Sequence, residues 1–89
     1  MQVDCHQGTL DNLYDALTKN VPAIVPVQTA ELPYWNHTPN QHAVVLVGMD
    51  AQFVYLNDPA FHIPALRVPI GDFDLAWLGQ GEQYAVLSL

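Results

Sequence analysis

The pattern of apolar and polar positions first becomes regular near the N-terminus. Four apolar side chains recur at i, i+3, i+4 and i+7, the spacing of one helix face, and they are Leu10, Leu13, Tyr14 and Leu17. Thr9 or Gly8 is available as the N-cap, and Asn20 can end the helix. The pattern therefore predicts an amphipathic helix over residues 9–19.

A run of apolar and β-branched residues follows this helix and predicts a strand. Residues 21–29 (VPAIVPVQT) contain Pro22 and Pro26, each of which lacks the backbone donor of a strand ladder. An edge strand or a bulged strand is therefore expected here. The next segment, residues 30–41, is rich in Pro, Asn and aromatic residues, which favours a long surface loop. Loops of this length often carry function.

Two further strand-like runs lie on either side of a short turn segment. Residues 42–48 (HAVVLVG) and residues 52–57 (QFVYLN) flank residues 49–51, and this arrangement predicts a β-hairpin. The first run is almost continuously apolar, which is typical of a strand buried on both faces. The Asp-Pro pair at residues 58–59 ends the second run, because proline removes a donor and fixes φ.

The C-terminal part predicts a short strand, a short helix and a last strand. Residues 67–70 form the first strand, and residues 83–89 (QYAVLSL) form the last. Three side chains share one face of the helix that starts near residue 71: Phe73, Ala76 and Trp77. The whole order favours an α+β fold, in which an antiparallel β-sheet carries one N-terminal helix and one short C-terminal helix.

The composition describes a small domain with few charges. The chain has 89 residues, which make a single domain over residues 1–89, and 51% of them are hydrophobic while only 12% are charged. An average soluble domain has roughly 25% charged residues. This balance fits either a domain with a face covered by a partner or a fragment of a larger domain whose missing half once covered that face, and the fragment is favoured. The net charge of −7 disfavours nucleic acid as a partner.

The sequence also bears on location and on disulfide bonding. No stretch is long and apolar enough to predict a membrane span, and the N-terminus lacks the basic start and apolar run of a signal peptide. A soluble protein is therefore expected, either cytoplasmic or exported, and the compartment stays open. Cys5 is the single cysteine, which excludes an intrachain disulfide.

His42 and Asp58 stand at the two outer ends of the predicted hairpin. A three-residue loop over residues 49–51 would pair position 42 with position 58, so both side chains would point to one face with Cβ atoms about 4.5–5.5 Å apart. A two-residue loop would send them to opposite faces. An imidazole oriented by a carboxylate is the base of a nucleophilic triad. A histidine at a strand start and an aspartate in a turn are also common without any catalytic role.

Four segments taken together resemble the C39-like cysteine peptidases. They are residues 17–29 (LTKNVPAIVPVQT), 41–50 (QHAVVLVGMD), 53–59 (FVYLNDP) and 73–77 (FDLAW). In that family a helix and a Pro-x-Ile-Val strand lead to a His-x-Val-Val-x-Val-Gly strand, an Asp-Pro corner and a late Phe-x-x-x-Trp segment. The resemblance implies a papain-like half domain with His42 as the general base and Asp58 as the orienting residue. Asn57 is the alternative orienting residue.

The N-terminal segment departs from the pattern of the family. The family's nucleophile lies in a Gln-x-x-x-x-Asp-Cys-Gly stretch that opens a long helix, and the Gln side chain helps to form the oxyanion hole. Residues 2–8 of this chain are QVDCHQG, so His6 stands in place of the glycine. The interval from Cys5 to His42 is also much shorter than in the family. Cys5 is therefore a weak candidate nucleophile, and a single cysteine is more often a small buried apolar residue than a nucleophile.

The remaining candidates concern a substrate cleft and a metal. Tyr34 and Trp35 in the long loop either line a substrate cleft or simply pack the loop against the domain. The four histidines, His6, His37, His42 and His62, show none of the short helical or loop spacings of a zinc site. No metal and no other cofactor is therefore expected.

The sequence thus predicts a C39-like cysteine peptidase domain, a thiol-dependent peptide or amide hydrolase, without its N-terminal nucleophile segment. As this chain alone it should be inactive. Its expected partners are a peptide substrate or the missing N-terminal segment, and its bare apolar side favours a homodimer. Two alternatives stay open: a compact thiol hydrolase that uses Cys5, and a non-catalytic peptide-binding or assembly module of papain-like fold.

Overall fold

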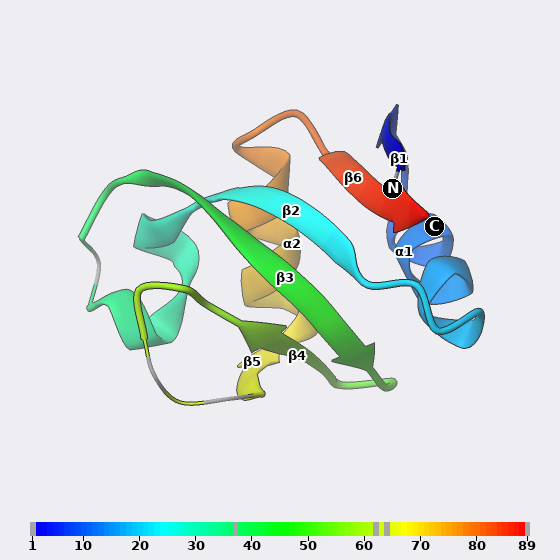
Figure 1. Cartoon of the computed structure of the whole chain (residues 1–89). Coiled ribbons are helices and arrows are strands. Elements are labelled where there is room, and N and C mark those ends of the chain that lie inside the picture. Colours follow the sequence, from blue (N-terminus) through cyan, green and yellow to red (C-terminus); the bar gives the residue numbers. More distant parts are fainter. Residues whose placement is uncertain (1, 37, 62, 64, 89) are drawn as a thin grey trace.

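One antiparallel sheet and two helices make up the computed structural model, which describes residues 2–36, 38–61, 63 and 65–88 (Figure 1). The elements in chain order are β1 (Gln2–Gln7), α1 (Leu10–Thr18), β2 (Ala23–Gln28), the 3-10 turns η1 (Thr29–Glu31) and η2 (Pro33–Trp35), β3 (Gln41–Met49), β4 (Phe53–Asn57), β5 (Leu66–Pro69), α2 (Ile70–Leu78) and β6 (Gln83–Ser88). The strand order is β1-β6-β2-β3-β4-β5, and every neighbouring pair is antiparallel. The predicted α+β class is confirmed.

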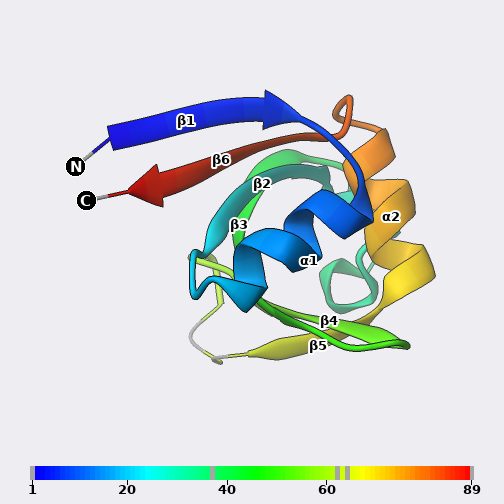
Figure 2. The same ribbon diagram turned by 90° about the vertical axis from the view of Figure 1, so that its right-hand side faces the viewer.

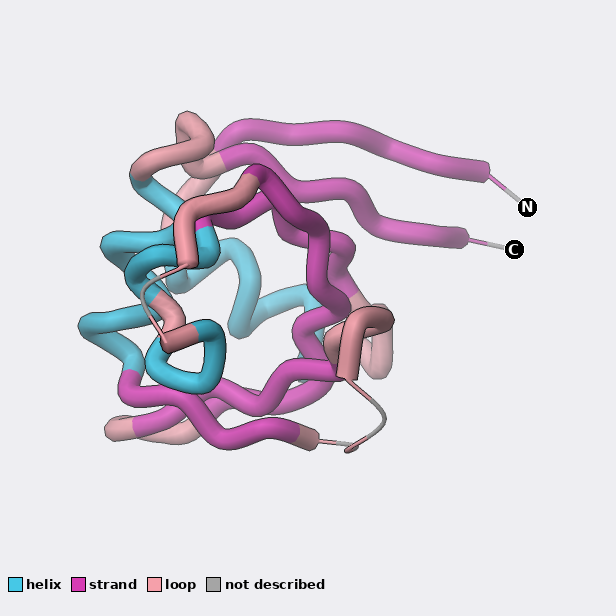
Figure 3. Tube along the Cα trace, turned by 90° about the vertical axis from the view of Figure 1, so that its left-hand side faces the viewer, coloured by secondary structure: helices cyan, strands magenta, loops and turns pink. Residues whose placement is uncertain are grey.

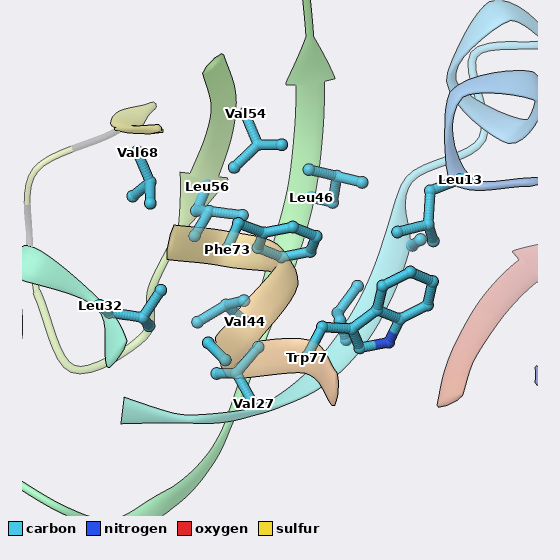
Figure 4. Packing of buried hydrophobic residues seen from close by; sticks show 13 residues of the cluster. Leu13, Val27, Leu32, Val44, Leu46, Val54, Leu56, Val68, Phe73 and Trp77 are labelled. Carbon is cyan, nitrogen blue, oxygen red and sulfur yellow. The ribbon is translucent and has the colours of Figure 1, made fainter. Parts of the chain in front are cut away.

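The sheet curves around the two helices, which lie on its concave side (Figure 2). The core fills the space between these layers, and Figure 4 shows side chains of both helices pointing toward those of the strands. Its fully buried apolar members are Leu13, Ala23, Val25, Val27, Leu32, Val44, Leu46, Val54, Leu56, Val68, Phe73, Ala76 and Trp77. Burying one large apolar side chain stabilises the fold by about 1.5–3 kcal/mol. Burial of these side chains between the helices and the sheet therefore stabilises the fold.

Helix α1 begins at a reciprocal capping interaction between Thr9 and Asn12. The Thr9 hydroxyl accepts from the backbone N–H of Asn12 at 3.3 Å, and the Asn12 side-chain oxygen accepts from the backbone N–H of Thr9 at 2.9 Å. Two otherwise unpaired donors of the first turn are satisfied in this way. The helix ends before Asn20, which adopts a left-handed φ of 59°. The predicted helix, its cap and its end are all confirmed.

Strand β2 lies inside the sheet and keeps one register with β3, so the prediction of an edge or bulged strand is wrong. It pairs along its whole length with β3, and on its other side β6 pairs with it at Ala23 and Ile24. Pro26 is beyond that second pairing and lies opposite Ala43 of β3. A residue without a backbone donor is tolerated there, because only one neighbour needs a hydrogen bond from this part of the strand.

Strand β1 was not predicted from the sequence. It pairs antiparallel with β6, and Cys5 lies opposite Ala85. Figures 2 and 3 show that β1 and β6 form an arm that reaches beyond the rest of the sheet, with the two chain ends side by side. The segment QVDCHQ has few apolar residues, so its sequence gives a weak strand signal. Its pairing comes from β6, at the far end of the chain.

The hairpin of β3 and β4 differs from the prediction in its register. Leu46 pairs with Leu56, but Gly48 pairs with Tyr55, so an extra residue, Val47, is inserted into β3 as a bulge. The strands then continue to Met49 and Phe53, and the predicted loop over residues 49–51 is wrong by one position. The bulge changes which residues of the two strands face each other, and this matters for the candidate site.

Candidate active site

The hairpin brings His42 and Asp58 together at one end of the sheet. Val45 pairs with Asn57, so continuing the register places Asp58 across from Val44, two positions from His42. Residues two apart in a strand point to the same face. The two side chains therefore meet, with 2.6 Å between Nε2 of His42 and Oδ1 of Asp58. The structure does not pair His42 directly with Asp58, as the predicted three-residue loop would have done. Because the bulge shifts the register by one residue, the two side chains still point to the same face of the sheet.

The carboxylate of Asp58 is buried and receives four hydrogen bonds. None of its side-chain surface is exposed, whereas 21% of the His42 side chain is exposed. Oδ1 accepts from His42 and from the backbone N–H of Ala60 at 2.9 Å. Oδ2 accepts from the Tyr34 hydroxyl at 2.8 Å and from Nε1 of Trp35 at 3.1 Å. Each oxygen thus has two donors in place of the water it has lost.

These donors determine the ionisation of Asp58. Burial disfavours its charged form, but the hydrogen bonds from Ala60, His42, Tyr34 and Trp35 outweigh this effect and lower the pKa of Asp58 below its usual value. The pKa of Tyr34 is raised by burial and by the nearby Asp58 carboxylate. Tyr34 therefore stays a neutral donor at physiological pH, and Asp58 stays ionised.

The hydrogen bond with Asp58 also fixes which nitrogen of His42 is free to react. An ionised carboxylate can only accept, so the proton of the short contact belongs to Nε2 of His42. In the neutral ring Nδ1 then carries the lone pair. The ring of Trp35 lies edge-on to the imidazole, with 5.3 Å between ring centroids. The geometry thus presents Nδ1 of a partly exposed, oriented imidazole as a base.

The loop between β2 and β3 supplies Tyr34 and Trp35. Thr29 anchors it: its backbone N–H donates to the carbonyl oxygen of Asn40 at 3.0 Å, and its hydroxyl donates to that of Thr38 at 2.6 Å. The side chain of Leu32 is fully buried in the core. The predicted long loop is therefore tied down at its base and at its middle, which holds the two aromatic residues over the site.

Phe61 completes the aromatic surroundings of the carboxylate. Its ring packs edge-on against Tyr34 with 5.1 Å between centroids, and against Trp35 with 5.3 Å. The backbone N–H of Phe61 donates to the carbonyl oxygen of Asp58 at 3.0 Å. Sequence reasoning named neither Phe61 nor Ala60. The available signal was the Asp-Pro corner itself, because a buried aspartate in such a turn accepts from the backbone two residues further on.

The other candidate residues lie apart from this pair. The side-chain oxygen of Asn57 accepts from the backbone N–H of Ala65 at 2.8 Å, so Asp58 is the neighbour of His42. Cys5 is exposed in β1, and β6 and β2 lie between β1 and β3. Three inter-strand steps of about 4.8 Å give a separation of about 14 Å along the sheet. Cys5 is therefore not beside His42, and it lies on a strand rather than at a helix N-terminus.

The structure offers no metal centre in the part of the chain that it describes. Within those residues, no group of three or more His, Cys, Asp or Glu side chains is arranged to hold a metal ion. His37 and His62, two of the four histidines considered from the sequence, lie outside the described residues. Among the residues that the structure describes, no helix is long and apolar enough to cross a membrane.

Fold and site together define an α+β protein with a histidine oriented by a buried carboxylate at one end of an antiparallel sheet. Residues 2–85 match the model of the Peptidase_C39 like family. The chain belongs to this family, and the predicted resemblance is confirmed.

A solved structure has the same fold. It is described as that of a C39-like peptidase from Bacillus anthracis, and it superposes with a TM-score of 0.79 at 22% sequence identity. The match covers 98% of this chain and 52% of the other, so the chain spans about half the length of that protein. The curated proteins contain no match to the sequence.

Proposed function

We propose that this chain is the base-bearing part of a C39-like cysteine peptidase whose nucleophilic cysteine lies outside these 89 residues. The observation that carries the proposal is the contact of 2.6 Å between Nε2 of His42 and the buried carboxylate of Asp58. A histidine held in this way is suited to activate a thiol, because its second nitrogen is free to take a proton. Membership of the Peptidase_C39 like family supports a peptide or amide bond as the target.

The reaction would use His42 first as a base and then as an acid. Nδ1 of His42 takes the thiol proton, and the thiolate sulfur attacks the carbonyl carbon of the substrate. When the C–N bond breaks, the leaving amine takes that proton from His42 and an acyl-enzyme thioester remains. His42 then takes a proton from water as the water oxygen attacks the thioester carbon, and when the C–S bond breaks the thiolate sulfur takes that proton from His42 and the carboxylic acid leaves. Asp58 stays ionised throughout and stabilises the imidazolium.

The extent of the match supports a nucleophile outside this chain. The solved relative continues over 48% of its length that this chain does not cover, since the match covers 52% of it. A papain-like arrangement, with a Cys-bearing helix from that uncovered part beside His42, would complete the site. The isolated chain is then expected to be inactive. It is also expected to self-associate through its bare apolar side, and sedimentation at several concentrations measures this.

The test is hydrolysis of fluorogenic peptide amides by the chain alone and by a longer protein in which a segment with a Cys-Gly helix precedes residue 1. The longer protein should show activity that iodoacetamide blocks, and His42→Ala should lower kcat/KM by about 10²–10⁴. The chain alone should show none, with or without Cys5→Ser. Activity of the longer protein that survives His42→Ala would contradict the assignment of the base.

A further inference from the structure

We propose that Tyr34 and Trp35 are positioning residues that together hold Oδ2 of Asp58, so that Oδ1 stays directed at Nε2 of His42. The proposal rests on the proposed function for its catalytic meaning, because the held histidine is the base of that reaction. From the sequence, these aromatic residues either line a substrate cleft or pack the loop against the domain. In the structure the polar end of each points at the carboxylate, at 2.8 Å for the Tyr34 hydroxyl and 3.1 Å for Nε1 of Trp35.

The two oxygens of the Asp58 carboxylate have different hydrogen-bond partners. An aspartate side chain can turn about its Cβ–Cγ bond, which would exchange or misalign its two oxygens. The backbone N–H of Ala60 and Nε2 of His42 contact only Oδ1. The contacts of Tyr34 and Trp35 are both to Oδ2, on the other side of the group. Donors on both oxygens restrain the rotation, and the pair on Oδ2 comes entirely from one loop.

The loop that carries Tyr34 and Trp35 is anchored by residues that do not contact the carboxylate. Thr29 is fully buried and bonds across the base of the loop, and Leu32 is fully buried in the core. The aromatic pair is thus held by the protein and not by the carboxylate alone. A donor that is fixed in this way can orient Asp58, instead of following it.

These two donors also preserve the negative charge of Asp58. Tyr34 and Trp35 are neutral donors, and burial together with the Asp58 carboxylate raises the pKa of Tyr34, so its proton is retained. Neutral donors stabilise the carboxylate without cancelling its negative charge. An arginine in the same place would pair with that charge and weaken its attraction for an imidazolium. The hydrogen bonds from Tyr34 and Trp35 therefore leave the full charge of Asp58 available to His42.

The experiment is a crossed pair of hydroxyl deletions in the 89-residue chain. Tyr34→Phe removes a donor to Asp58, and Tyr55→Phe removes a hydroxyl bond of 2.7 Å to Asp50, outside the site. Carboxyl ¹³C NMR titration gives the pKa of both aspartates in each variant. Tyr34→Phe should raise the pKa of Asp58 by about one unit and leave that of Asp50 unchanged, and Tyr55→Phe should do the reverse. Trp35→Phe should act as Tyr34→Phe does.

A second readout addresses orientation. A short histidine–carboxylate hydrogen bond gives a far-downfield proton signal, here that of Nε2–H of His42, and this signal should shift upfield in the double variant Tyr34→Phe/Trp35→Phe. An unchanged pKa of Asp58 and an unchanged His42 signal in folded Tyr34→Phe and Trp35→Phe would overturn the proposal. If Trp35→Phe does not fold, Tyr34→Phe decides alone. Neither readout requires hydrolysis, so the result stands apart from the test of the peptidase function.

Discussion

A carboxylate stays ionised inside a protein only where donors replace the water it has lost. Asp58 meets this condition with donors from three separate parts of the chain: the loop with Tyr34 and Trp35, strand β3 with His42, and the turn with Ala60. A neutral side chain of the same shape cannot accept four such bonds, because an amide carries donors of its own. The identity of this single residue therefore decides whether the surrounding groups are satisfied.

Asp58→Asn should consequently lower the free energy of unfolding at pH 7. One half of the amide would direct its N–H groups at two of the four converging donors, and an unsatisfied buried donor costs about 1–3 kcal/mol. Urea denaturation of the wild-type chain and the variant measures the difference. Asp50→Asn is the matched control, because Asp50 also accepts several hydrogen bonds but is exposed. A loss no larger at Asp58 than at Asp50 would contradict this account.

The same variant tests the dependence of stability on pH. The pKa of Asp58 is lowered in the folded protein, while its value in the unfolded chain is about 3.9. The folded state thus binds a proton less readily, and the stabilisation from Asp58 is present above about pH 4 and lost as pH falls through the lower pKa of the folded state. Urea midpoints between about pH 5 and pH 2 should fall less steeply in Asp58→Asn. Equal slopes would mean that Asp58 is not held ionised by the fold.

At the scale of the elements, the loop between β2 and β3 is the part whose order matters most for the site. Its rigidity depends on Thr29, whose hydroxyl lies 2.6 Å from the carbonyl oxygen of Thr38 and 3.2 Å from that of Asn40. Both carbonyl groups belong to the end of the loop that leads into β3. A side chain that starts the loop thus fixes where the loop returns.

Thr29→Val keeps the shape of the side chain but removes the hydroxyl, and it should lower the free energy of unfolding by about 1–3 kcal/mol. Thr18→Val is the control, because the Thr18 hydroxyl makes an equally short bond of 2.6 Å to the carbonyl oxygen of Asp15 on the exposed side of α1. That control should change stability by no more than about 0.5 kcal/mol. Chemical denaturation compares the two variants. Equal losses in the free energy of unfolding would show that the Thr29 hydroxyl stabilises the fold no more than an exposed hydroxyl does.

The elements show where sequence reasoning succeeds and fails in this chain. Helix α1 was predictable because its apolar spacing and its cap are both local signals. The interior position of β2 was not, because the effect of Pro26 depends on how far β6 extends along its neighbour. The strand β1 was missed for a similar reason, since its partner is at the other end of the chain. Pairing over long sequence separations is decided by tertiary contacts that no short window contains.

Sequence reasoning also identified some residues of the candidate site and missed the roles of others. His42 and Asp58 were identified from their places at the hairpin ends, although the bulge at Val47 brings them together by a different register. The donors on Oδ2 were not foreseen, because Tyr34 and Trp35 approach through a loop whose path has no periodic signal. An aspartate that the fold buries must find donors, and only the three-dimensional structure shows which ones it finds.

At the scale of the whole molecule, the strand order separates the single cysteine from the histidine. Cys5 is exposed on β1, and two strands lie between it and the strand of His42. The alkylation rate of Cys5, followed against pH by intact mass, should therefore be the same in the wild-type chain and in His42→Ala. The conservative variant Cys5→Ser, which cannot be alkylated at this position, confirms the site of reaction. Fast alkylation that persists below neutral pH and is lost in His42→Ala would mean that the two residues form a working pair, and the nucleophile would then lie within this chain.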